Sequence, residues 1–402
     1  MFRDIFSHSI EGLRMSPIVE ISEMAKRLAP FFKERTGKSL ICFQRGEMGS
    51  DTPEYIKDAA KQAIDQGMTK YPKSGGEVLL KKAIEYKVYF CGARNISSDN
   101  ILCTAGGQEA LELAFRLFEG EKGAGFTPCW SCILENQVPY ASIDFQEVLL
   151  NDDFTIDFDA LEKVLREVRF FYFNNPQNPT GKVFTREDVE KIAHLCYKYG
   201  VYLISDEAYE DIIFDGQKHF SASVIELPNI ICAFTFSKSF AMTGWRLGYI
   251  FARDERIAKL LSLANYSQTA GVPPFIQYAG TVALNNSDCR KNHISSMLAV
   301  FQQKRDRMFA GLKEIDGLIV QKPGGAFYFF PSFANFIPSG LNEEDYKMFI
   351  YNILLEEGVV VVPGYCFGKG FEANVRLSFS TTSLEEIDDG VERIKQALEK
   401  LK

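Results

Sequence analysis

The chain has 402 residues, a length that favours two domains, and its 46% hydrophobic and 24% charged residues are ordinary for a globular protein. Its net charge of −8 argues against a nucleic-acid partner, because no basic excess is available to displace phosphate counterions. The N-terminus lacks the apolar stretch of a signal peptide, no run approaches membrane-spanning length, and nine cysteines are typical of reduced thiols, so we expect a cytoplasmic protein without a membrane partner.

Apolar strand-like runs alternate with amphipathic helical patterns over residues 50–284. The clearest strand-like runs are 100–104, 170–173 and 201–205, and the clearest helical patterns are 108–118 and 186–199. Such alternation predicts βαβ units, and therefore a mostly parallel sheet covered by helices on both faces. We expect residues 50–284 to form a large domain.

The pattern changes near residues 285–288. A long helical pattern at 293–315 is followed by apolar runs at 317–321, 326–330 and 359–362 and by a last helical pattern at 384–400. We expect residues 285–402 to form a smaller α/β domain.

Two glycines join a predicted strand to a predicted helix at residues 104–108. Gly106 and Gly107 allow the backbone to approach a ligand, and Gln108 lies in the first turn of a helix whose N-terminus offers free N–H groups to an anion. Because many α/β proteins contain such a turn, this segment alone indicates only a candidate phosphate site.

The segment from Cys129 through Trp130 to Cys132 has the spacing of a redox-active cysteine pair, but a thioredoxin-like site needs a small fold around it. Trp130 could equally be a core residue. The histidines lie far apart without metal-ligand spacing, so we predict no metal site. They are His8, His194, His219 and His293.

Polar residues follow two further strand-like runs. Asp206 and Tyr209 come directly after the run 201–205, and open α/β sheets bind ligands at the carboxyl ends of their strands. Without context, this aspartate could equally cap the next helix. Asn178 lies in a proline-rich segment after the run 170–173, which by its own chemistry is only a turn.

Lys238 directly follows an apolar run at 230–236. A lysine held at the end of a buried strand has a lowered ammonium pKa, which suits it to form a Schiff base with a carbonyl compound. Thr235 and Ser237 supply hydroxyls, and Arg246 supplies a guanidinium, which are the groups that bind phosphate. The alternative is a solvated lysine beyond a core strand.

Arg376 lies between apolar residues in the segment 374–378, which predicts a strand whose guanidinium points into a pocket. A guanidinium binds a carboxylate in bidentate fashion. A structural ion pair is the alternative.

These segments, in this order, resemble the class I and II aminotransferases of fold type I, the group similar to aspartate aminotransferase. The resemblance runs from about residue 17 to the C-terminus. It rests on the segments 70–76, 104–108, 175–181, 206–209, 237–249 and 374–378. It implies an α/β fold with a mostly parallel seven-stranded sheet in a large domain and a smaller α/β domain, to which residues 1–49 add an N-terminal arm.

The resemblance also implies an enzyme that uses pyridoxal 5'-phosphate. Lys238 would hold the cofactor and carry the substrate proton, Asp206 would pair with the pyridine nitrogen, and Trp130 would lie on the ring. Tyr209 and Asn178 would bind the phenolate oxygen.

The remaining implied roles concern the phosphate, the substrate and a second subunit. The phosphate group would be held by Gly106, Gly107, Gln108, Thr235, Ser237 and Arg246. Arg376 and Asn178 would hold the substrate carboxylate, beside Gly46. Tyr71 would reach the phosphate of a neighbouring subunit, so the resemblance implies a homodimer with shared active sites.

The chain departs from the family pattern at two places. Residues 48–50 read Met-Gly-Ser where the family commonly has Pro-Asp-Phe, and Ile133 stands where many aspartate aminotransferases have a histidine that supports the ring aspartate. Arg116 is a weak candidate for binding a second substrate carboxylate, and a surface ion pair is its alternative.

The resemblance implies ping-pong transfer of an amino group from an L-amino acid to a 2-oxo acid. A pyridoxal-phosphate lyase on the same fold, of the C–S lyase or aminocyclopropane-carboxylate-synthase kind, would keep every residue named above. A cofactor-binding regulator without enzymatic activity would need a basic DNA-binding module, for which neither terminus has room or charge.

Overall fold

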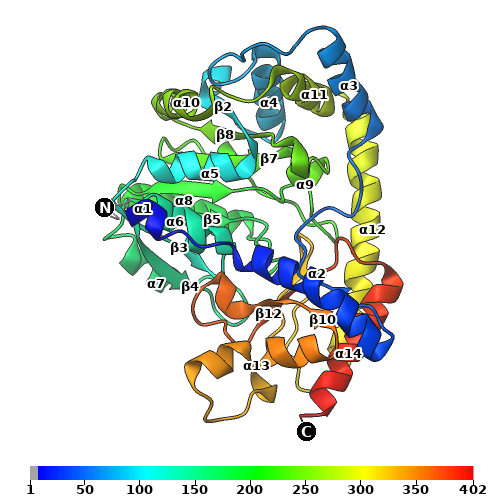
Figure 1. Ribbon diagram of the computed structural model, residues 1–402. Helices are drawn as coiled ribbons and strands as arrows, with labels where there is room; N and C mark the ends of the chain where they lie inside the picture. The colour runs from blue at the N-terminus through cyan, green and yellow to red at the C-terminus, as the bar shows by residue number, and fades with distance from the viewer. Residues whose placement is uncertain (1–7, 402) are drawn as a thin grey trace, which may run out of the picture.

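The structure, a computed structural model, describes residues 8–401 (Figure 1). Its larger part is a seven-stranded sheet with the spatial order β2-β8-β7-β6-β5-β3-β4. Within this sheet β8 runs antiparallel to β2 and β7, and the other neighbours pair in parallel, so the predicted α/β fold with a mostly parallel sheet is confirmed. The strands are β2 (Ile101–Thr104), β3 (Lys122–Thr127), β4 (Asp144–Leu149), β5 (Phe170–Asn174), β6 (Tyr202–Asp206), β7 (Ile230–Thr235) and β8 (Gly248–Ala252).

Both faces of this sheet are buried. Alternate residues of β5 enter different apolar clusters: Phe170 and Tyr172 pack on the face that carries α5, and Phe171 and Phe173 pack on the opposite face. Phe115 of α5 meets the Phe170 ring edge-on, with 5.3 Å between centroids. Burial on two faces explains why these strands are continuous apolar runs without a polar side.

Helices and short turns connect the strands. The helices of this part are α3 (Glu54–Asp65), α4 (Val78–Phe90), α5 (Gly106–Arg116), α6 (Val138–Tyr140), α7 (Phe158–Val164), α8 (Arg186–Lys198), α9 (Phe236–Ser239), α10 (Glu255–Thr269) and α11 (Pro274–Asn285). The 3₁₀ turns of the described chain are η1 (Ser98–Asn100), η3 (Ala222–Val224), η4 (Thr243–Trp245), η5 (Ala334–Phe336) and η6 (Gly364–Phe367), and η2 (Ile133–Gln137) is a π-turn.

A smaller group of strands lies beside the large sheet. β1 (Ile41–Cys42) pairs in parallel with β10 (Val359–Val360), and an antiparallel sheet has the order β11-β12-β9. Its strands are β9 (Tyr328–Phe329), β11 (Val362–Pro363) and β12 (Val375–Ser378). The helices of this part are α1 (His8–Glu11), α2 (Pro17–Thr36), α12 (Ser287–Lys313), α13 (Glu343–Glu356) and α14 (Leu384–Glu399). The domain limits at residues 49/50 and 284/285 stay a prediction.

Two of the predicted elements differ in the structure. The helix predicted at 293–315 begins at Ser287, because the side chain of Asn286 caps it by accepting a hydrogen bond from the backbone N–H of Cys289 (3.2 Å). The apolar run at 317–321 forms no strand: Ile319 makes an isolated bridge with Ser332, and it is half exposed instead of packing in the core. Within residues 8–401, no helix has the length and apolarity needed to cross a membrane.

The parallel strands bring chemically useful residues to one edge of the large sheet. Asn174, Asp206 and Thr235 are the last residues of β5, β6 and β7. In the register of the sheet, Asn174 lies beside Asp206. In Figure 1, α2 and the β12 region lie beside this part of the molecule. Residues distant in sequence therefore meet at this edge, as expected for an open α/β sheet.

Candidate active site

A cavity of about 860 Å³ opens at the carboxyl edge of the large sheet. Of the predicted site residues, Gly106 and Tyr71 do not line it and all the others do. The predicted residues that line it are Gly46, Gly107, Gln108, Trp130, Asn178, Asp206, Tyr209, Thr235, Ser237, Lys238, Arg246 and Arg376. The fold therefore collects these dispersed segments around one space.

Lys238 reaches this cavity from α9, the short helix after β7. Its Nζ donates a hydrogen bond to the backbone carbonyl of Gly46 (2.7 Å). Burial, followed by the positive charge of Arg376, lowers the pKa of Lys238 to about 8. About a tenth of this amine is therefore unprotonated and nucleophilic at pH 7, far more than for an ordinary lysine.

Asp206 lies at the end of β6 and is 5% exposed. Burial raises the pKa of its carboxyl to about 6, against the effect of hydrogen bonds from the Ala208 backbone N–H and from the Tyr172 hydroxyl (both 3.1 Å). Tyr172 therefore supports this aspartate, although Ile133 supplies no polar group. A positive charge placed beside the carboxylate would lower its pKa again.

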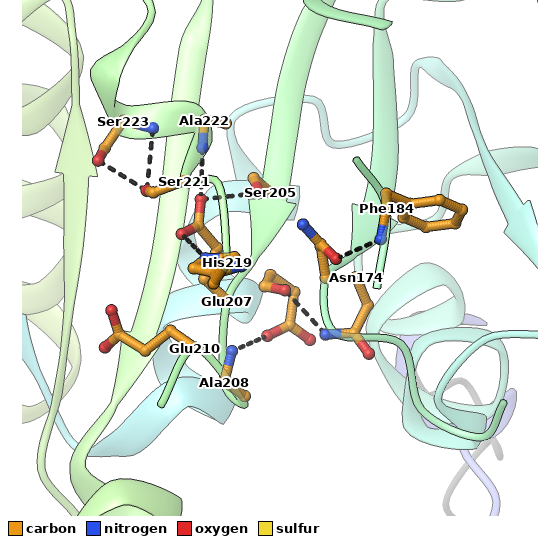
Figure 2. Close-up of polar contacts among 12 residues, drawn as sticks. Asn174, Phe184, Ser205, Glu207, Ala208, Glu210, His219, Ser221, Ala222 and Ser223 are labelled. Atoms are coloured by element: carbon orange, nitrogen blue, oxygen red, sulfur yellow. Dashed lines mark hydrogen bonds and ion pairs between the residues drawn. The ribbon is translucent and has the colours of Figure 1, made fainter. Parts of the chain in front are cut away.

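Glu207, the residue after Asp206, does not line the cavity. Its side chain points toward His219 and Ser205 (Figure 2). The buried carboxylate of Glu207 accepts hydrogen bonds from His219 Nε2 (2.8 Å), Ser205 Oγ (3.0 Å) and the Ala222 backbone N–H (2.9 Å). Burial alone would raise the pKa of Glu207, but the bonds from His219 and its other donors hold it below its usual value. This network fixes the turn that carries Asp206 and Tyr209.

Arg376 on β12 is 1% exposed. Its Nη1 donates to Asn178 Oδ1 (2.9 Å) and its Nη2 donates to the Gln44 carbonyl (3.0 Å), whereas its buried Nε has no partner among residues 8–401. A carboxylate in the cavity can satisfy this remaining donor. A Cβ atom on Gly46 would lie 2.7 Å from Tyr328 Oη, so this wall accepts only glycine without rearrangement.

The glycine turn and α9 form a concave polar surface. Gly106 has φ +87°, and a Cβ atom there would lie 2.5 Å from Arg246 Nη2. A Cβ atom on Gly107 would lie 3.2 Å from Thr235 Cβ. The Ser237 and Thr235 hydroxyls lie 2.9 Å apart at the N-terminus of α9. Glycines here leave space beside a guanidinium, two hydroxyls and a helix N-terminus, which suits a phosphate group.

Several predicted residues have other surroundings. Tyr71 is 94% exposed and lies outside the cavity of its own chain. Arg116 pairs with Glu119 (3.8 Å) on the surface and does not line the cavity, as its alternative interpretation expects. Cys129 and Cys132 are buried free thiols, and burial raises the pKa of Cys132 to about 11, so neither has the thiolate character of a redox centre.

Sequence reasoning missed many polar residues of the cavity, among them Asn174 and Tyr328, and it missed Tyr172 beside Asp206. Tyr172 and Tyr328 stand in apolar runs and carry no local signal of a site. Asn174 stands directly before the proline-rich turn, and no pattern distinguishes it from the turn residues. Asn174 Oδ1 accepts from the Asn178 backbone N–H (2.7 Å), and the Tyr328 hydroxyl lies 2.9 Å from that of Tyr209. Only the fold shows that these side chains meet.

The sequence profile described as "Aminotransferase class I and II" matches residues 38–394. The chain belongs to this family. A probable aspartate/prephenate aminotransferase of Aquifex aeolicus is 34% identical over 401 residues, 98% of each chain. Aromatic-amino-acid aminotransferase 2 of Thermococcus litoralis is 32% identical over 91% of this chain and 93% of that protein.

Solved structures agree with this assignment. The aspartate aminotransferase of Thermus thermophilus with maleate has a TM-score of 0.88 and 28% identity, over 98% of this chain and 99% of that chain. The aspartate aminotransferase of Rhizobium meliloti has a TM-score of 0.87 and 30% identity, over 98% of this chain and 99% of that chain. Fold type I, dependence on pyridoxal phosphate and transamination between an amino acid and a 2-oxo acid are thereby confirmed.

The cavity of this aminotransferase fits its cofactor. It offers a nucleophilic amine on Lys238, a buried carboxylate on Asp206 and an anion-binding surface at Gly107 and Arg246. These three groups match the aldehyde, the ring nitrogen and the phosphate of pyridoxal phosphate in chemistry.

The pKa of Lys238 predicts how the apoenzyme captures added cofactor. We expect the rate of covalent attachment, followed by visible absorbance, to rise with pH with a midpoint near 8, because only the neutral amine attacks an aldehyde. Arg376→Gln should move the midpoint to higher pH, since it removes a neighbouring positive charge. Arg307→Gln, in an exposed pair with Asp388, is the control. A midpoint at the ordinary lysine value of 10.5 would show that the cavity does not lower the pKa of Lys238.

Proposed function

We propose that Lys238 is the catalytic residue of this aminotransferase and that Asp206, Tyr209, Asn178 and Arg376 bind its cofactor and substrate. The observation that carries the proposal is the amine of Lys238, partly buried in the cavity with a pKa of about 8. Strongly shifted pKa values inside a cleft are characteristic of catalytic groups.

Lys238 acts first as the covalent anchor and then as the proton carrier. The bound cofactor supplies an electron sink that stabilises negative charge on the substrate α-carbon. Once released from that anchor, Lys238 Nζ takes the proton from the substrate α-carbon and would deliver it to the C4′ carbon of the bound cofactor, which its lowered pKa permits near neutral pH. Arg376 and Asn178 hold the substrate carboxylate, so that the α-carbon is presented in one orientation.

The other predicted residues hold the cofactor in place. Asp206 faces the ring nitrogen and keeps it protonated, Tyr209 donates to the phenolate oxygen, and Trp130 covers the ring. The phosphate is held by Gly106, Gly107, Gln108, Thr235, Ser237 and Arg246. All of these residues except Gly106 line the cavity, and Gly106 lies against Arg246, which supports this arrangement.

The cavity favours an acidic amino donor such as aspartate. Besides Arg376, Arg14 and Arg45 line it together with Glu47 and Glu112, and within residues 8–401 neither of these two arginines forms an ion pair. Arg45 adjoins Gly46, whose carbonyl contacts Lys238, and we propose that its guanidinium binds the second carboxylate of such a donor. The relatives named aspartate aminotransferase support this choice.

Aromatic donors are the second candidate. Trp130 and Tyr140 line the same cavity together with the apolar side chains of Leu13, Ile18 and Leu111. The Thermococcus litoralis relative is named for aromatic amino acids. A wall with both guanidiniums and apolar surface can accept both classes.

A second copy of the chain completes each active site in this proposal. The Tyr71 side chain is almost fully exposed. Large apolar side chains are exposed on two helices of the same part of the molecule, α4 and α10. They are Val78, Leu79, Tyr86, Tyr89, Phe90, Leu260, Leu263 and Tyr266. Exposed apolar surface of this extent on a soluble enzyme is typical of an interface, and a symmetric dimer would bury it on both copies.

Borohydride tests the role of Lys238. Reduction of the purified yellow protein should fix the cofactor to Lys238, identified by peptide mass spectrometry, because it converts the linkage into a stable secondary amine. Lys238→Ala should abolish both the adduct and transamination between an amino acid and a 2-oxo acid. Lys182→Ala, a lysine outside the main cavity, should change neither. An adduct that persists in Lys238→Ala would show that Lys238 does not carry the cofactor.

Mixing two inactive variants tests the shared site. Tyr71→Ala should bind cofactor weakly, and Lys238→Ala should be inactive. If Tyr71 serves the partner's cavity, a hybrid dimer of the two has one intact site, so a mixture at equal concentrations should regain about one quarter of wild-type activity. Sedimentation measures the dimer directly. No recovery after verified subunit exchange would show that Tyr71 acts in its own chain or not at all.

Arg45→Gln tests the choice of donor. We expect the KM for aspartate to rise about tenfold and the KM for phenylalanine to stay within about twofold, because only the former loses a charge-assisted hydrogen bond. Arg307→Gln removes the same charge from an exposed pair with Asp388, outside the cavity, and is the matched control. Equal effects of Arg45→Gln on both substrates would contradict its proposed role.

A further inference from the structure

Tyr328 occupies a position between the two halves of the active site. It lies on β9 of the smaller sheet, is 1% exposed and lines the cavity. Its hydroxyl lies 2.9 Å from the hydroxyl of Tyr209, which follows β6 of the large sheet. Its neighbour in register, Ser378, lies two residues beyond Arg376 on β12. No motif in the sequence marks this tyrosine.

The ring of Tyr328 supports the guanidinium of Arg376. The Arg376 Cζ atom lies 4.4 Å from the centre of the Tyr328 ring, and the Phe367 ring lies 5.1 Å away. An aromatic face at this distance attracts a desolvated guanidinium. The ring therefore fixes the plane in which Arg376 presents its unpartnered Nε, and it does so without using a donor that a carboxylate needs.

The hydroxyl of Tyr328 has a different partner. Each tyrosine hydroxyl has one proton to donate. When Tyr209 donates its proton to the cofactor, its oxygen can still accept, and among residues 8–401 the Tyr328 hydroxyl is its hydrogen-bonding neighbour. The order of donation is then Tyr328 to Tyr209 to cofactor. A hydroxyl that accepts a hydrogen bond is a stronger donor, because hydrogen bonds in a chain polarise one another.

We propose that Tyr328 is a positioning residue that joins the two halves of the site, with its ring supporting Arg376 and its hydroxyl donating to Tyr209. This inference rests on the proposed roles of Arg376 and Tyr209. Tyr328 thus links the group that binds the substrate carboxylate to the group that binds the cofactor oxygen. Its two functions reside in different atoms, so they can be removed separately.

Tyr328→Phe removes the hydroxyl and keeps the ring. With less donation from Tyr209, the cofactor oxygen holds more negative charge, and Lys238 Nζ beside it retains its proton to higher pH. We expect the pH midpoint of the cofactor's visible absorbance change, measured without substrate, to rise by about half a unit to one unit. The KM for the amino donor should stay within about twofold, because Arg376 keeps its support.

Tyr328→Leu removes the ring as well. It should show the same shift in the absorbance midpoint and, in addition, a rise of about 3- to 30-fold in the KM for the amino donor, from loss of the cation–π contact. Tyr351→Phe is the control: this buried tyrosine of α13 has its hydroxyl 3.7 Å from Met24 Sδ, away from the cavity, and its removal should move neither value.

Tyr209→Phe separates failure of this inference from failure of the proposed function. If Tyr209→Phe raises the midpoint and Tyr328→Phe leaves it unchanged, the hydroxyl of Tyr328 does not act through Tyr209 and the inference is overturned. If neither variant moves the midpoint, the proposed role of Tyr209 is wrong. Circular dichroism and cofactor content verify folding, and the conservative phenylalanine variant decides the question if the leucine variant does not fold.

Discussion

The geometry of the cavity depends on the buried carboxylate of Glu207. A buried carboxylate costs several kcal/mol unless donors surround it. Glu207 obtains its donors from His219, Ser205 and the backbone of Ala222, so the turn after β6 has one favourable arrangement (Figure 2). Since Glu207 is held in the wall, the carboxylate before it, Asp206, lies in the cavity. A neutral residue without hydrogen bonds at position 207 would not fix the direction in which the Asp206 carboxylate points.

Burial shifts the pKa values of two residues of the cavity, Asp206 and Lys238, in opposite directions. It raises the pKa of Asp206 to about 6 and lowers that of Lys238 to about 8, because the charged form of each group is less stable in the cavity than in water. In the proposed site, a cationic ring nitrogen beside Asp206 and a covalent linkage on Lys238 would both relieve this cost. The protein is therefore prepared for its cofactor, and binding should stabilise the fold as well as start the chemistry.

The sequence predicted the fold class and twelve of the residues that line the cavity, because most of those twelve stand at strand ends in segments with a local signal. Gly107 opens a helix, Asp206 ends an apolar run and Lys238 follows another. Tyr172 and Tyr328 escaped notice since a tyrosine within an apolar run looks like core. Their hydroxyls acquire partners only through the pairing of strands far apart in the chain, which no local pattern encodes.

The contacts that close the cavity are all of long range. Lys238 meets the carbonyl of a residue 192 positions away, Arg376 meets Asn178 across 198 positions, and Tyr209 meets Tyr328 across 119. Each joins the large sheet to the part that carries β9, β12 and residues 44–46. Carboxylate binding and the acid–base state of Lys238 therefore depend on the same packing, and a change between the two sheets will alter both together. Tyr328→Phe, which removes one oxygen atom, should separate the two, since it is expected to shift the acid–base midpoint and leave carboxylate binding unchanged.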